Sequence, residues 1–114
     1  MRFEHEIRQQ LNRSIEARRG AWPHLKPSYQ LIISALAWSL GEGKKDTFVP
    51  GFGISRGEYE IKRRIIECMK KRERISILSK NWQVIISCLE WVLGDSDIMP
   101  LEARENIYLG VQVD

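Results

Sequence analysis

Hydrophobic residues recur every three or four positions in two long, otherwise charged segments, residues 4–19 and 58–73. This spacing places the apolar side chains on one face of a helix, so it predicts two amphipathic helices. The predicted stripes consist of Phe3, Ile7, Leu11 and Ile15 in the first helix and Ile61, Ile65, Cys68 and Met69 in the second.

Two further segments, residues 28–41 and 81–94, are apolar over most of a helical circumference. Their main stripes consist of Tyr29, Ile32, Ile33, Leu36 and Leu40, and of Trp82, Ile85, Ile86, Leu89 and Leu93. Trp38 and Trp91 lie on the adjoining face and are expected in the core or between paired helices. Helices that are apolar on most sides belong in the middle of a core, so we expect these two segments to face each other.

The two halves of the chain repeat one another. Residues 28–41 align without gaps on residues 81–94, with eight identities in fourteen positions, and residues 4–19 match residues 58–73. We therefore predict an internal duplication, with one unit over about residues 3–50 and a second over about residues 57–100. A short C-terminal helix or tail over residues 101–114 completes the single domain expected over residues 1–114.

The predicted fold is all-α, with four to five helices arranged as two pseudo-symmetric helical hairpins packed into a compact bundle. Each hairpin alone would expose a large apolar face to water, which favours packing of one on the other. Residues 73–78 are rich in β-branched side chains, so a short strand is the alternative there, and the tail over residues 108–114 is open in the same way.

Residues that favour helix ends accompany these patterns. Pro27 suits a first helical position, and Ser55 with Glu58 has the spacing of a capping box. Gly41 and Gly94 stand where a left-handed residue commonly ends a helix. Each predicted helix of the central pair thus has a defined end.

The composition is that of an ordinary globular protein, with 43% hydrophobic and 29% charged residues, which excludes a disordered tail and a disulfide scaffold. Cys68 and Cys88 lie in apolar stretches without a C-x-x-C spacing, so we expect small reduced core residues and a cytoplasmic location. The most apolar run, residues 29–40, is shorter than the roughly 20 residues that a membrane helix needs, so no membrane partner is expected.

Charge is distributed unevenly along the chain. Residues 62–80 contain eight Lys or Arg and two Glu, whereas residues 81–114 contain one Arg and six acidic residues. Helical geometry gathers the cations of the third segment on its outer side, and the candidates for binding a macromolecule are Arg63, Arg64, Lys70, Lys71 and Arg74. Such a surface suits an acidic protein or phosphates. The alternative is a solvated face whose cations pair with Glu67.

No arrangement of residues predicts catalysis. No nucleophile has an identifiable base, His5 and His24 lack the spacing of metal ligands, and the glycines of residues 51–57 miss a dinucleotide-binding pattern by one position. We therefore expect no catalytic residue, no metal and no cofactor. Two polar pairs recur at equivalent places, and we expect them to form a buried, hydrogen-bonded seam: Gln30 with Ser34, and Gln83 with Ser87.

These observations favour a non-enzymatic binding protein, an adaptor, inhibitor or regulator that engages another protein through the basic helix. Phe52, in the long glycine-rich loop, is the candidate for an additional partner contact. The alternative is a nucleic-acid-binding regulator that contacts phosphates with the same cations. A third possibility is a homo-oligomer in which the acidic C-terminal third of one copy meets the basic helix of another.

Overall fold

The computed structural model describes residues 1–42 and 56–110, so Phe52 lies outside the described residues. Within these ranges, five α-helices and two short 3-10 turns, η1 and η2, follow one another. Their bounds are α1 (Glu4–Gly20), η1 (Pro23–Leu25), α2 (Lys26–Ser39), α3 (Glu58–Arg74), η2 (Ser76–Leu78), α4 (Ser79–Leu93) and α5 (Pro100–Leu109). No strand occurs within the described ranges: residues 73–74 end α3, Ile75 is its non-helical C-cap residue, and residues 76–78 form η2.

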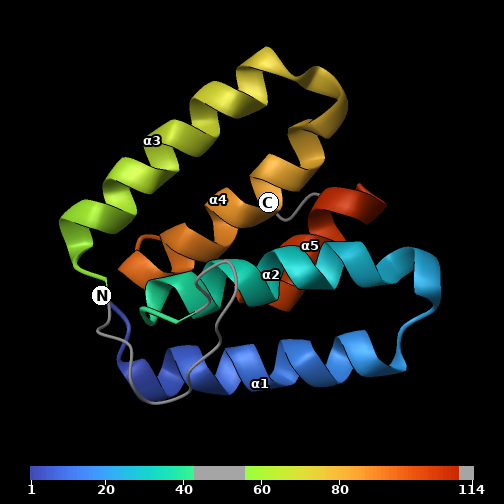
Figure 1. Ribbon diagram of the computed structural model, residues 1–114, viewed down its shortest axis with the longest axis horizontal. Coiled ribbons are helices and arrows are strands. Elements are labelled where there is room, and N and C mark those ends of the chain that lie inside the picture. Colours follow the sequence, from blue (N-terminus) through green and yellow to red (C-terminus); the bar gives the residue numbers. More distant parts are fainter. Residues whose placement is uncertain (43–55, 111–114) are drawn as a thin grey trace.

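The helices form two hairpins, and each hairpin contributes one helix to a central pair (Figure 1). α1 packs on α2, α3 packs on α4, and α2 and α4 pack against each other, while α5 lies against α4 and α2. The all-α prediction and the central position of α2 and α4 are thereby confirmed. α1 and α3 are each 17 residues long, in keeping with the sequence repeat, whose common origin stays a prediction.

The core is built from apolar side chains of the four hairpin helices. The largest fully buried ones include Leu11, Ile32, Leu36, Ile61, Ile86 and Leu89. Each contributes roughly 2 kcal/mol of transfer free energy when it leaves water. Cys68 and Cys88 are free and buried, and burial raises the pKa of both thiols, as expected for small core residues.

Glycines end both central helices in the left-handed conformation, as predicted. Gly41 has φ 76° and Gly94 has φ 87°, values that a side chain with a Cβ adopts only at a cost. After α2 the chain folds back so that the Glu42 amide donates to the Ala37 carbonyl at 2.8 Å. The glycine therefore lets the last turn of the helix satisfy its own carbonyls.

The predicted capping box of Ser55 with Glu58 involves Ser55, which lies outside the described residues. α3 begins at Glu58, and Gly57 is its N-cap residue. Pro27 is the second rather than the first residue of α2. Arg56, just before α3, makes a tertiary contact that local sequence signals do not contain.

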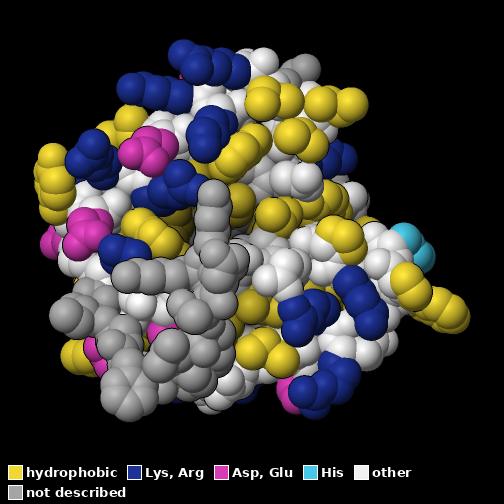
Figure 2. Space-filling view, viewed as in Figure 1, with side chains coloured by type: hydrophobic (Ala, Val, Ile, Leu, Met, Phe, Trp, Pro, Cys, Tyr) yellow, Lys and Arg dark blue, Asp and Glu magenta, His cyan; other side chains and the backbone are white. Residues whose placement is uncertain are grey.

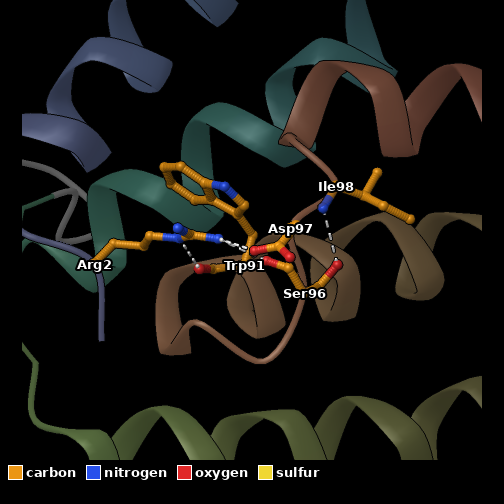
Figure 3. Close-up of polar contacts among 5 residues, drawn as sticks. All are labelled: Arg2, Trp91, Ser96, Asp97 and Ile98. Atoms are coloured by element: carbon orange, nitrogen blue, oxygen red, sulfur yellow. Dashed lines mark hydrogen bonds and ion pairs between the residues drawn. The ribbon is translucent and has the colours of Figure 1, made fainter.

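Arg2, just before α1, binds the far end of α4 (Figure 3). Its amide donates to the Val92 carbonyl at 2.7 Å, and its Nε donates to the Trp91 carbonyl at 3.0 Å. The guanidinium carbon lies 5.1 Å from the Trp91 ring centroid, and Nη2 donates to the Ser96 carbonyl at 2.9 Å. A cation thus satisfies carbonyls at a helix C-terminus, where the helix dipole favours positive charge.

Arg56, just before α3, makes the same contacts with the end of α2. Its amide donates to the Ser39 carbonyl at 2.8 Å, its Nε donates to the Trp38 carbonyl at 3.3 Å, and its guanidinium carbon lies 5.1 Å from the Trp38 ring centroid. Each hairpin therefore supplies the arginine that caps the central helix of the other. We call these two contacts the arginine clamps.

The polar pairs on α2 and α4 form the predicted hydrogen bonds but not in the predicted place. The Gln30 and Gln83 side-chain amides donate to the Ser34 and Ser87 hydroxyls at 3.2 and 3.3 Å. Arg18 and Arg72 donate to the side-chain oxygens of the same glutamines. Gln30 and Ser34 are exposed and the second pair is half-buried, so the expectation of a buried seam was wrong. The seam links the helices of each hairpin at the surface.

Candidate functional site

The outer side of α3 combines exposed cations with exposed hydrophobic side chains. α3 packs against α4 and η2, and its buried side consists of Ile61, Ile65 and Cys68. The opposite side carries five exposed residues that we call the outer stripe: Tyr59, Arg63, Ile66, Lys70 and Arg74. Figure 2 shows Lys and Arg side chains gathered over α3 with hydrophobic side chains between them.

The N-terminal part of this surface is largely neutralised by helical ion pairs. Arg63 and Arg64 share one carboxylate, with Nε and Nη1 lying 3.8 and 3.2 Å from the Glu67 oxygens. Lys62 Nζ lies 2.9 Å from Glu58 Oε1, which lowers the pKa of that carboxyl and raises the pKa of the lysine. The alternative of a solvated, internally paired face therefore describes this half of the helix.

The C-terminal part keeps its positive charge. Within the described chain, Lys70 and Arg74 have no ion-pair partner, and Lys71 Nζ lies 5.1 Å from the Trp82 ring centroid. Ile77, in the turn that follows, is 89% exposed. Of the predicted binding residues, Lys70 and Arg74 thus lie on the outer stripe with no ion pair in the described chain, Lys71 lies over the Trp82 ring, and Arg63 and Arg64 are engaged with a glutamate.

Two apolar residues interrupt the cations of the outer stripe. Tyr59 is 77% exposed and Ile66 is 54% exposed. They line a shallow depression of about 450 Å³. Its remaining lining residues are Lys62, Arg63, Glu67 and Lys70. Sequence reasoning missed Tyr59 and Ile66 because it followed charge alone, although their seven-residue spacing places them on the basic side.

α1 provides an internal comparison for this surface. The buried positions of the two helices match, with Ile7 equivalent to Ile61 and Leu11 equivalent to Ile65. The positions equivalent to the outer stripe are also exposed, and they are His5, Gln9, Asn12, Glu16 and Gly20. α1 occupies the same place in its hairpin as α3, but it has no large aliphatic or cationic residue at these equivalent positions. Packing within a hairpin therefore does not require the outer stripe.

The fold and this surface define a small all-helical protein with an exposed basic and apolar helix face. When the chain is compared with protein-family models, with curated proteins and with solved structures, no significant match is found. None of the helices in residues 1–42 and 56–110 is long and apolar enough to cross a membrane. In the same ranges, no three His, Cys, Asp or Glu side chains group as metal ligands.

Proposed function

We propose that this protein is a non-enzymatic binding protein, an adaptor, inhibitor or regulator, that engages an acidic surface of a partner protein through the outer stripe of α3. The single observation that carries the proposal is the exposure of Tyr59 and Ile66 among the cations of this stripe. Aromatic and aliphatic side chains within a polar rim are typical of protein interfaces, and the charge favours an acidic partner.

The same cations support a nucleic-acid-binding regulator as the second candidate. Phosphate contacts need only positive charge, and they supply most of the affinity in such complexes. An exposed isoleucine at the centre of the surface gains little from a phosphate backbone. This feature favours the protein partner over nucleic acid.

The test compares two alterations of the outer stripe with one matched control. The first variant reverses two unpaired cations, Lys70→Glu with Arg74→Glu, and the second is Ile66→Asp. The control reverses two exposed cations of α1, Arg13→Glu with Arg19→Glu, which changes the net charge by the same amount as the first variant. Binding is measured by capture from cell extract with and without nuclease, followed by titration of the captured partner.

We expect both stripe variants to weaken partner binding by about tenfold or more, since central interface residues commonly contribute 1–2 kcal/mol or above, and the control to bind normally. Binding that ignores all stripe substitutions overturns the proposal. If only the charge reversal abolishes binding, and binding is sensitive to nuclease, the partner is nucleic acid instead. The logarithm of its binding constant should then fall with the logarithm of salt concentration with a slope near −0.9 per phosphate contacted. Light scattering that shows a dimer dissociated by salt identifies self-association.

A further inference from the structure

Arg104, on α5, is buried without a counter-charge. It is 8% exposed, and its Nε donates to the Ser28 hydroxyl at 2.7 Å. Within residues 1–42 and 56–110 no carboxylate lies within ion-pair distance of its guanidinium. Arginines are seldom buried unless an anion compensates the charge. The surroundings of Arg104 therefore favour the binding of an anion.

Two tyrosines fix the position of the guanidinium. Its central carbon lies 3.9 Å from the ring centroid of Tyr29 on α2 and 5.8 Å from that of Tyr108 on α5. The Tyr108 hydroxyl in turn donates to Asn81 Oδ1 at 2.5 Å. A guanidinium presents five N–H donors in a planar fork, and only the Nε donor has a partner among the described residues. The Nη1 and Nη2 donors remain available side by side.

A cleft of about 450 Å³ opens beside Arg104, between η1, the first turns of α2 and α4, and the end of α5. This volume is in the range of sites for small organic molecules and far exceeds that of an inorganic ion. Its apolar lining includes Leu25, Pro27 and Leu109. The cleft thus combines one fixed cation with a hydrophobic wall.

We propose that this cleft binds a small organic acid, with its carboxylate on the Nη donors of Arg104 and its apolar body against the hydrophobic wall. Arginine and carboxylate match as two parallel hydrogen bonds. The Glu105 side chain also lines the cleft, which disfavours a doubly charged phosphate. The site is independent of the outer stripe of α3.

The test is an NMR titration of the full chain with 3-phenylpropanoate as the probe and its neutral amide, 3-phenylpropanamide, as the matched control. We expect saturable shifts of Ser28, of Tyr108 and of the Arg104 side-chain Nε–H, with a dissociation constant of about 0.1–1 mM. The amide should bind at least about tenfold more weakly, because a neutral amide cannot accept the two parallel charge-assisted hydrogen bonds that a carboxylate accepts.

Two variants separate binding from structure. Arg104→Lys keeps the charge but loses the fork, and should weaken binding by about tenfold. Glu105→Gln removes a like charge from the exposed rim and should tighten binding by about threefold, whereas Glu102→Gln, outside the cleft, should leave it unchanged. Three results each overturn the proposal: no saturable shift, equal binding of acid and amide, or displacement of the probe by inorganic phosphate at equal concentration.

Discussion

Aromatic rings hold three arginines at inter-element contacts of this protein. Arg2 and Arg56 each lie over a tryptophan ring, and Arg104 lies over two tyrosine rings. A planar, weakly hydrated guanidinium stacks on such rings while its edge donates to carbonyls or hydroxyls. Lysine, a compact and strongly hydrated point charge, lacks this combination. Arginine is therefore specifically suited to these positions.

Glu90, half-buried on α4, has a raised carboxyl pKa. Desolvation is the main cause, Asp95 adds repulsion, and Arg72 opposes the shift. Because the folded pKa lies above the unfolded one, the folded state loses stability as pH rises from the unfolded pKa through the folded pKa. Glu90→Gln should therefore raise the free energy of unfolding at pH 7. The difference should vanish well below about pH 4, where the Glu90 carboxyl is protonated in both the folded and the unfolded state.

Urea denaturation at both pH values measures this effect, with the exposed Glu102→Gln as the control for a generic loss of negative charge. A Glu90→Gln variant that is no more stable than the parent at pH 7 would contradict the assignment. A stabilisation that persists unchanged in acid would point to packing rather than ionisation.

At the scale of elements, the arginine clamps should be measurable in isolation. Arg2→Ala and Arg56→Ala each remove the side-chain hydrogen bond from Nε to a helix-terminal carbonyl and a cation–π contact, so each should lower the free energy of unfolding by about 1–2 kcal/mol. Arg19→Ala, whose side chain is 71% exposed, should cost less than about 0.5 kcal/mol. Chemical denaturation compares the three, and clamp variants as stable as the control would refute the role.

Much of the element structure could be predicted because its causes are local. Periodicity placed helices over residues 4–19 and 58–73, within one residue of the observed ends, and Gly41 and Gly94 marked true helix ends. The capping box of Ser55 stays a prediction, because Ser55 lies outside the described residues. The arginine clamps connect opposite halves, so an alignment of equivalent positions shows that Arg2 and Arg56 correspond but not what they contact.

The candidate sites divide in the same way. The cations of α3 are conspicuous in the sequence and were predicted, because a surface helix keeps most of its charges outside. The burial of Arg104 was not predictable, since it depends on Tyr29 and Tyr108 arriving from distant parts of the chain. Pairing by Glu67 likewise decides which cations of α3 remain available.

For the whole molecule, the shared α2–α4 contact should make the two hairpins unfold together. Leu36 and Leu89 are equivalent in the repeat and almost fully buried, so Leu36→Ala and Leu89→Ala should each destabilise by about 2–5 kcal/mol. Ile66→Ala, at a 54% exposed position, should change stability by less than about 0.5 kcal/mol.

Tryptophan fluorescence and far-UV circular dichroism, followed in the same urea titration, should give coincident single transitions for the parent and for each variant. Two separated transitions, or destabilisation by Leu36→Ala that leaves the α3–α4 hairpin folded, would contradict a shared core. A near-neutral result for Ile66→Ala would show that folding does not depend on the Ile66 side chain.

The reciprocity of the arginine clamps has a geometric consequence. Arg2 caps the end of α4, and Arg56 caps the end of α2. Two separate copies of one hairpin, associated about a twofold axis, would therefore make the same clamp contacts as this single chain. Covalent linkage makes the association of the two hairpins independent of protein concentration, and it allows their sequences to differ. One outward helix can then specialise while its counterpart remains a plain scaffold.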